Sequence, residues 1–299
     1  MNNLTRRSAL RGFAVTGIGL TLPSIIDISH ADDLYLVDDL SRSDLALYAL
    51  LQFDGDRTLP RQFKFPDHVR TGEIWGIDVS HHQGRVDWSD MPDQGVFFAY
   101  LKASQGKSFR DREFGRNWLA IKELRSQGKK IHGGAYHFLS AGFSGEEQAT
   151  NFIDRIGGKL DASDMPACLD LEWDFEVRNG RVIPNDRWGA LSSERIVRKA
   201  LSWLAAVEQA TGKRPIIYTN AHWWHERIGN RKDLAGYPIW IADYSKKSLE
   251  AEKPREIDGH SWTIWQLTDR GSTSGIGGNV DTNRFSGNEK DFYKAFQIT

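Results

Sequence analysis

Two carboxylates, Asp170 and Glu172, lie in an otherwise apolar segment that runs from Met165 to Trp173. Its apolar residues, with Pro166 near the start, predict a short buried strand. Side chains two positions apart on a strand point to the same side, so both carboxyl groups share one face. Burying both groups costs free energy unless they are hydrogen-bonded or one of them stays protonated. The segment is therefore a candidate for acid–base chemistry.

Paired carboxyl groups in different environments have pKa values that are pushed apart, which gives one proton donor and one stabilising anion. Glycoside hydrolysis uses this arrangement. A structural interpretation also remains, because acidic residues cost little where a strand end leaves a barrel into solvent. Cys168 in the same segment is the only cysteine of the chain, so an internal disulfide is impossible. Its leucine neighbours favour packing as a small hydrophobic side chain over a nucleophilic role.

The composition is that of a globular protein without a general affinity for nucleic acid. With 299 residues, of which 39% are apolar, the chain can build a substantial core. A net charge of −1 provides no general attraction to nucleic acid. His222 and His225 lie one helical turn apart, but no carboxylate at metal-ligand spacing accompanies them, which favours a surface helix over a metal site. We expect no metal, no cofactor and a monomer.

The amino terminus resembles a twin-arginine export signal. Arg6 and Arg7 precede a modest uncharged run, and Ser29 and Ala31 fit a small-x-small signal for cleavage after Ala31. We therefore expect residues 1–31 to be a signal peptide and the protein to be periplasmic or secreted, with no membrane association after cleavage. Residues 32–72 form an N-terminal extension with a predicted helix at 41–53, and residues 73–299 form the remaining domain.

Strand and helix patterns alternate from residue 73 onward. Besides the segment of Asp170 and Glu172, strand patterns cover 74–80, 96–103, 130–139, 215–220, 238–244, 262–268 and 279–285. Helix patterns cover 113–127, 146–156 and 193–210, each followed by glycine. The alternation predicts parallel strands with crossovers, and eight strands suggest a closed barrel. Since the last strands are joined by loops with weak helical signal, we expect an α/β fold with a single irregular (β/α) TIM-like barrel and an N-terminal helical extension.

Polar residues end nearly every predicted strand, which favours a barrel over an open doubly wound sheet. In a barrel these ends converge on one mouth, where such enzymes keep their sites, whereas a sheet would spread them along an edge. The residues are Asp78, Lys102, Tyr136, Asp170, Glu172, Tyr218, Asp243, Gln266 and Asp281. Asp78 and Asp281 lie on the first and last strands, which become neighbours when a barrel closes.

Several motifs occur in an order that resembles the family 25 glycoside hydrolases, the muramidase type of lysozyme. Each motif alone is weak, whereas their order and spacing together are specific. The motifs are Gly76-Ile77-Asp78-Val79-Ser80-His81-His82-Gln83-Gly84, Tyr136-His137-Phe138, Leu169-Asp170-Leu171-Glu172, Ile217-Tyr218-Thr219, Trp240-Ile241-Ala242-Asp243-Tyr244, Trp265-Gln266 and Gly278-Asn279-Val280-Asp281-Thr282-Asn283. The resemblance covers roughly 73–285. One departure is Gln105, where many relatives carry an acidic residue.

The resemblance implies cleavage of the β-1,4 bond between N-acetylmuramic acid and N-acetylglucosamine in the glycan strands of peptidoglycan. The resemblance further implies that Glu172 is the general acid and that Asp170, Asp78 and Asp281 are the acidic residues beside it in the site. The residue types also favour Glu172 as the proton donor, because its side chain reaches further than that of Asp170 from the same face. Burial and neighbouring anions would also keep such a donor protonated. In the second half of the reaction, either Asp170 attacks directly or the 2-acetamido oxygen of the substrate does so while Asp170 orients it.

Substrate-binding candidates are the other polar and aromatic residues at strand ends: Tyr136, Tyr218, Trp240, Asp243 and Gln266. For the tyrosines and Trp240, packing in the core is an equally good interpretation. Two other functions remain open from the sequence. One is a chitinase or endo-N-acetylglucosaminidase, although this class expects a longer acidic ladder. The other is a non-catalytic wall-binding barrel, against which the presence of Glu172 argues.

Overall fold

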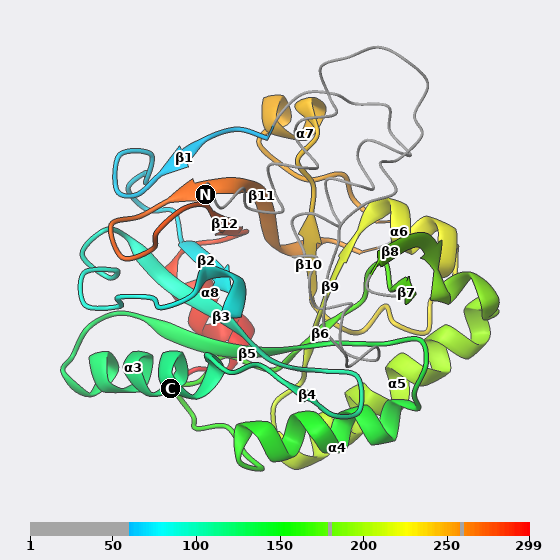
Figure 1. The fold of residues 1–299 in the computed structure, drawn as a ribbon. Coiled ribbons are helices and arrows are strands. Elements are labelled where there is room, and N and C mark those ends of the chain that lie inside the picture. The colour runs from blue at the N-terminus through cyan, green and yellow to red at the C-terminus, as the bar shows by residue number, and fades with distance from the viewer. Residues whose placement is uncertain (1–59, 179–180, 258–259) are drawn as a thin grey trace.

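The computed structural model describes residues 60–178, 181–257 and 260–299, and the predicted signal peptide and the helix at 41–53 lie outside these ranges. Eight of the described strands close into a barrel, in the order β2-β3-β5-β6-β9-β10-β11-β12 and back to β2 (Figure 1). They are β2 (Trp75–Val79), β3 (Val96–Gln105), β5 (His132–Phe138), β6 (Cys168–Asp170), β9 (Ile216–Asn220), β10 (Ile239–Ala242), β11 (Trp262–Ser272) and β12 (Val280–Phe285). The predicted barrel is confirmed.

The barrel is irregular because its last strand runs against its neighbours. The pairs from β2 through β11 are parallel, whereas β12 is antiparallel to both β11 and β2. Only residues 273–279 connect β11 to β12. A parallel return would need a crossover of about a dozen residues or more, so this short loop dictates the antiparallel pairing.

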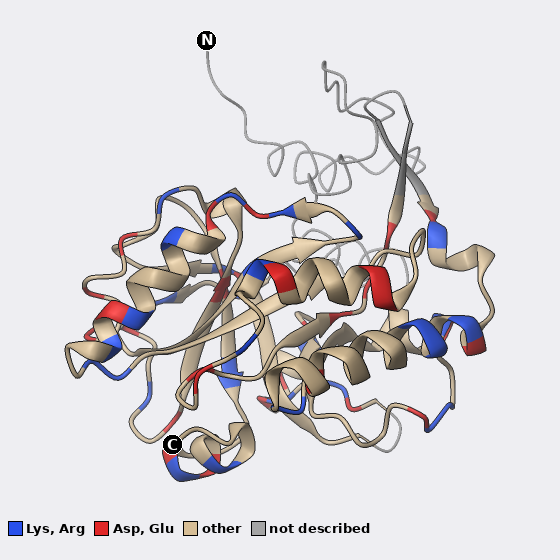
Figure 2. Ribbon diagram, turned by 90° about the horizontal axis from the view of Figure 1, so that it is seen from below, with Lys and Arg blue, Asp and Glu red and all other residues tan. Residues whose placement is uncertain are grey.

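Three long helices cover one side of the barrel, and each begins and ends within one residue of its predicted pattern. They are α3 (Phe114–Ser126), α4 (Gly145–Ile156) and α5 (Ser193–Thr211). The Ser144 and Glu147 side chains form a reciprocal capping box at the start of α4, and Gly157 takes the left-handed conformation after its end. Acidic and basic residues are interspersed over the outer faces of these helices, as expected for a net charge near zero (Figure 2).

The remaining elements are short. They are β1 (Phe63–Lys64), β4 (Phe109–Arg110), the hairpin β7 (Phe175–Arg178) and β8 (Arg181–Asp186), the 3-10 turns at His81–Gln83 and Arg187–Ala190, α6 (Ala221–Arg227), α7 (Lys246–Ala251) and α8 (Glu289–Phe296). Strand β1 pairs in parallel with the end of β11, and the Phe63 ring lies 4.5 Å from that of Trp75. The described part of the N-terminal extension therefore packs on the barrel.

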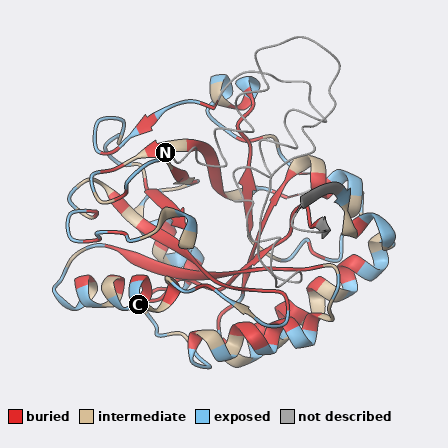
Figure 3. Cartoon of the chain, in the orientation of Figure 1, coloured by how far each residue is buried: buried red, intermediate tan, exposed pale blue. Residues whose placement is uncertain are grey.

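The hydrophobic core has two layers, one inside the barrel and one between the barrel and its helices (Figure 3). Phe98, Tyr100 and Trp240 belong to the inner layer, and α8 adds Phe292, whose ring lies 5.6 Å from that of Phe98. A Cβ atom at Gly134 would lie 2.3 Å from the Tyr100 ring, so only glycine fits beside it. Inside the barrel the polar candidates therefore lie at the carboxyl ends of the parallel strands. Asp281 is the exception, because β12 runs antiparallel and carries it at its amino end.

Within the described ranges, the helices are all too short or too polar to cross a lipid bilayer.

The outer layer contains a buried histidine, His137, that makes stability depend on pH. Its Nδ1 lies 2.8 Å from the Ser104 hydroxyl, and its ring stacks on Trp203 with centroids 5.6 Å apart. Burial lowers the pKa of His137 from 6.5 to about 3. Between these values the unfolded chain binds a proton that the folded chain does not, so acidification favours unfolding, by up to roughly 1.4 kcal/mol per pH unit.

We therefore expect the free energy of unfolding to fall as the pH drops from about 6.5 toward 3, and His137→Phe to reduce that slope. Denaturant unfolding of both proteins at several pH values measures the two slopes. Burial also lowers the pKa of His132, which acts in the same direction in both proteins, so the difference between the slopes isolates His137. Equal slopes would contradict a neutral His137 in the folded state.

Candidate active site

The candidate acids Asp78, Asp170, Glu172 and Asp281 lie at or just beyond strand ends, and each is at most 3% exposed. Asp78 and Asp281 are directly opposite each other in the β2–β12 ladder. Asp170 ends β6, and the Leu171 amide donates to the Tyr218 carbonyl at 2.9 Å, so the chain still follows β9 as it reaches Glu172. The short β2–β12 pairing thus brings together two aspartates that are 203 positions apart in the sequence.

The pKa of Tyr244, a residue just after β10, is affected by the acidic residues near it. Burial raises the pKa of its phenol well above the usual value, and negative charge at Asp281, Asp269 and Glu172 adds to the shift. Carboxylates from the end of β6, from β11 and from β12 therefore act on one side chain. Glu172 and Asp281, far apart in the sequence, therefore both lie near enough to Tyr244 for their charge to act on its phenol.

Asp78 is held by two amide groups. Gln266 Nε2 and Asn283 Nδ2 both donate to Asp78 Oδ2 at 2.8 Å. The Gln266 carbonyl oxygen in turn accepts from the Tyr218 hydroxyl at 3.0 Å and from the Tyr244 hydroxyl at 2.6 Å. With its oxygen committed to two phenols, the Gln266 amide can only present its nitrogen to Asp78, which fixes the orientation of both groups.

Trp240 completes the network from the inside of the barrel. Its Nε1 donates to Asn283 Oδ1 at 2.9 Å, and its ring lies 4.9 Å from those of both Tyr100 and Tyr218. The indole is fully buried among these rings. Tyr136 is also buried, and it pairs in register with Cys168 on β6. Of the predicted substrate-binding residues, Tyr218, Trp240 and Gln266 thus belong to one hydrogen-bonded and packed cluster around Asp78.

Asp243 is engaged elsewhere. Its carboxylate accepts from the Arg255 side chain at 2.9 and 3.0 Å, from the Arg255 amide at 2.8 Å and from the Ser245 amide at 3.1 Å. The Asp243 backbone amide donates to the Gln266 carbonyl at 3.0 Å, but both carboxylate oxygens are committed to Ser245 and to Arg255, which follows α7, and not to the network around Asp78.

Sequence reasoning did not single out Asp269, a fully buried carboxylate on β11 whose charge acts on Tyr244. Simple alternation from Gln266 would favour Thr268 and Arg270 for the same face. The β11–β12 pairing, however, shifts register on both sides of Thr268, so the period of two fails there. In the sequence, the only indication that Asp269 could belong to the site is its position three residues after Gln266 of the Trp265-Gln266 motif.

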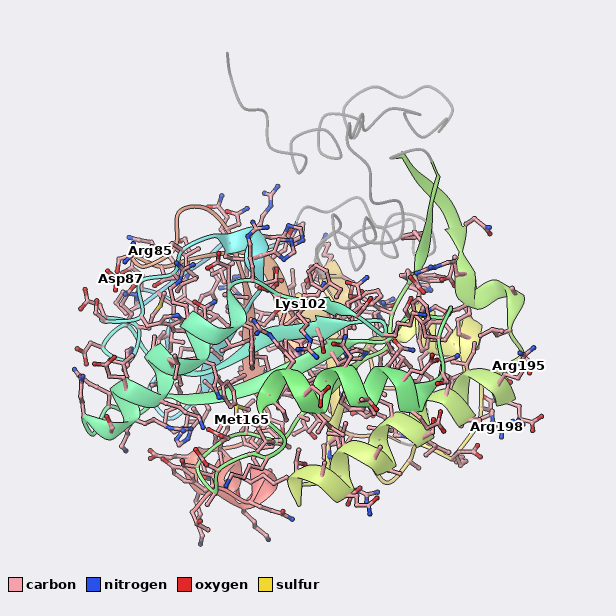
Figure 4. All side chains as sticks on the ribbon, turned by 60° about the horizontal axis from the view of Figure 1, so that its bottom comes forward. Arg85, Asp87, Lys102, Met165, Arg195 and Arg198 are labelled. Carbon is pink, nitrogen blue, oxygen red and sulfur yellow. The ribbon has the colours of Figure 1, made fainter. Side chains whose placement is uncertain are left out.

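A buried cation lies near the same end of the barrel. Lys102 on β3 is 5% exposed, and its Nζ donates to Gln105 Oε1 at 2.8 Å. The amine also lies 5.4 Å from the centroid of the Phe109 ring. Figure 4 shows Lys102 over the strands, far from the labelled Arg195 and Arg198 of α5. Gln105, the departure noted in the sequence, is therefore a direct partner of this lysine.

His222 and His225 lie on helix α6, as the sequence predicts. Across the described ranges, we find no group of three or more His, Cys, Asp or Glu side chains arranged to hold a metal ion. The chemistry available to the arrangement is that of carboxyl groups. One can donate a proton to a leaving oxygen, while nearby anions stabilise positive charge that develops on the substrate.

The comparisons with known proteins agree on one family. Residues 77–276 match the family described as glycosyl hydrolases family 25. YegX, an uncharacterized protein of Escherichia coli O157:H7, is 35% identical over 223 residues, which are 73% of this chain and 71% of YegX. Lysozyme M1 of Streptomyces globisporus is 31% identical over 225 residues, which are 73% of this chain and 69% of the lysozyme. The crystal structure of the bacterial lysozyme from Streptomyces coelicolor has a TM-score of 0.65 and 29% identity, covering 76% of this chain and 99% of its own.

Proposed function

This chain belongs to family 25 of the glycosyl hydrolases, and from that premise we propose that it is an exported muramidase. The bond cleaved is the β-1,4 bond between N-acetylmuramic acid and N-acetylglucosamine in peptidoglycan. What supports the proposal is a set of four buried acids at or near strand ends: Asp170 and Glu172 at the end of β6, and Asp78 paired with Asp281 where β12 closes the barrel.

In the proposed reaction, Glu172 donates its proton to the glycosidic oxygen, and the bond between that oxygen and the anomeric carbon breaks. The carbonyl oxygen of the substrate's own 2-acetamido group attacks the anomeric carbon and forms a cyclic intermediate. Water then opens this intermediate and returns its proton to Glu172.

Asp170 is proposed to hold the acetamido N–H and to stabilise the positive charge of the intermediate. The physical reason is reach: if the two side chains share a face, as the sequence predicts, the aspartate side chain is one methylene shorter than that of Glu172. Asp78 and Asp281 supply further negative charge, and the amides of Gln266 and Asn283 keep Asp78 in place.

Digestion of purified peptidoglycan tests the function directly. Mass spectrometry of the soluble fragments should find N-acetylmuramic acid at the new reducing ends. Reducing N-acetylglucosamine would indicate a glucosaminidase instead, and release of sugar from chitin would indicate a chitinase. Binding to peptidoglycan without release of fragments would make the barrel a non-catalytic wall-binding protein.

Export rests on the twin-arginine pattern at Arg6 and Arg7. We expect the mature protein to begin at Asp32, which the intact mass of protein recovered from outside the cytoplasm would measure. Replacing both arginines by lysine should retain the full-length chain inside the cell. Export of that variant at the normal level would reject the twin-arginine route.

A further inference from the structure

The sequence continues the acidic alternation beyond Glu172 to a third carboxylate, Asp174. A continuing strand would put Asp174 on the same face as Asp170 and Glu172. The strand instead ends at Asp170, and Asp174 is fully buried in a different set of contacts. Its role therefore differs from that of the two acids before it.

The Asp174 carboxylate is fully engaged on both oxygens. Oδ1 accepts from Arg187 Nη2, and Oδ2 accepts from the Ser140 hydroxyl at 2.9 Å and from the Ala141 amide at 2.6 Å. Arg187 Nη2 also donates to the Ser140 hydroxyl at 2.9 Å. Asp174 thus joins the loop after β5 to the turn that follows the β7–β8 hairpin, and both segments flank the chain that carries Glu172.

The backbone around Asp174 is fixed by the same turn. The Arg187 amide donates to the Asp174 carbonyl at 2.8 Å, and the Asp174 amide donates to Asp186 Oδ1 at 2.9 Å. Asp186 is itself held by Arg227 Nε at 2.6 Å. Since the β7–β8 hairpin begins at Phe175, just after Asp174, and ends at Asp186, these bonds close its base.

One further bond reaches Glu172 itself. Trp188, which follows Arg187 in the turn, donates from its indole Nε1 to the Glu172 carbonyl at 2.8 Å. Its ring is fully buried and packs edge-on against Trp223 of α6, with centroids 5.8 Å apart. The position of the Glu172 backbone therefore depends on the turn that the Asp174–Arg187 pair holds in place.

We propose that Asp174 is a positioning residue for the proton donor: through Arg187 and the Trp188 indole it fixes the backbone of Glu172 and aims its carboxyl group at the leaving oxygen. The inference rests on the proposed function, in which Glu172 is the acid. With both oxygens occupied, Asp174 acts through Glu172 and not on the substrate. Displacing a catalytic group by about 1 Å can reduce the rate about 100-fold. Weakening the contacts between Asp174, Arg187 and Ser140 should therefore lower the turnover number.

The test compares Asp174→Asn with a matched variant at the other end of the same strand. Asp164 precedes β6, is 1% exposed in its side chain, and accepts from Arg125 Nη2 at 2.7 Å. Asp164→Asn therefore removes another buried, arginine-paired charge, away from Glu172; Asp164 also lies 3.3 Å from Lys122 Nζ. Unfolding temperature, kcat, KM and the pH profile of kcat are measured on soluble peptidoglycan fragments for both variants and the unmodified protein.

We expect both variants to lose thermal stability. Asp174→Asn should lower kcat roughly 10- to 100-fold with KM within about twofold, and should shift the basic limb of its pH profile, which reports the proton donor. Asp164→Asn should leave kcat and the profile unchanged. An Asp174→Asn protein with normal kcat and an unshifted profile would overturn the proposal, and so would an equal loss of kcat in both variants.

Two milder variants keep the test decisive if Asp174→Asn does not fold. Arg187→Lys keeps the charge but loses the planar guanidinium, and Ser140→Ala removes one donor to Asp174. Each should lower kcat less than Asp174→Asn and shift the profile in the same direction; normal values in both would reject the positioning role. Failure of the proposed function is separately visible, because the unmodified protein would then release no fragments with N-acetylmuramic acid at the reducing end. An active Glu172→Gln variant would reject Glu172 as the acid whatever the Asp174 variants do.

Discussion

Replacing Glu172 with glutamine is expected to lower turnover of peptidoglycan about 100- to 10,000-fold, the usual contribution of a positioned general acid. Glutamine has nearly the same shape but cannot donate a carboxyl proton to the leaving oxygen. The replacement leaves the Glu172 carbonyl, and thus its bond from the Trp188 indole, in place. Initial rates of fragment release and a separate assay of binding to insoluble peptidoglycan measure the two effects, and binding should persist.

A matched control for this variant is Glu147→Gln on α4. Glu147 accepts from Ser144 in the capping box, a role that glutamine also fulfils, so activity and stability should stay near normal. Undiminished lysis by the Glu172 variant would remove the residue from the mechanism. Loss of both lysis and folding, seen as a lost unfolding transition, would show that the side chain is needed for structure.

Replacing Asp170 with asparagine is expected to lower kcat roughly 100- to 1,000-fold, in the range seen when one electrostatic contact to developing charge is lost. In the proposed reaction the aspartate faces a positive charge that exists only after the bond begins to break. Asparagine removes the negative charge without changing the volume of the side chain. Because the ground-state substrate carries no such charge, KM should change little, and steady-state kinetics on soluble glycan fragments separate the two constants.

The substrate distinguishes the two possible roles of Asp170. If the acetamido group supplies the attacking oxygen, glycan from which the N-acetyl groups have been removed should not be cleaved by the unmodified protein. Cleavage of that glycan at a normal rate would instead indicate direct attack by Asp170. In that case a covalent link between the sugar and Asp170 should be detectable by mass spectrometry.

From the sequence alone, the eight barrel strands, the three long helices and the candidate acids could be predicted, whereas the β7–β8 hairpin and Asp269 could not. Strand and helix periodicity is local, and capping signals such as Ser144 with Glu147 mark boundaries within a few residues, so α4 and its neighbours were predictable. The acidic Asp170–Glu172 pair was likewise recognisable, because its residues are close in the sequence. The order of the motifs then indicated the family that the comparisons support.

Only the tertiary structure decided which of these residues lie side by side and which are bound elsewhere. Closure of the barrel through the antiparallel β12 puts Asp281 opposite Asp78, and a register shift in β11 brings in Asp269, which alternation could not reveal. Asp243, a predicted substrate-binding residue, is committed to Arg255, and Asp174, the next acid after Glu172, is committed to Arg187. Such partners are chosen by register and long-range packing, which no local pattern encodes, and these contacts fix where each carboxylate lies.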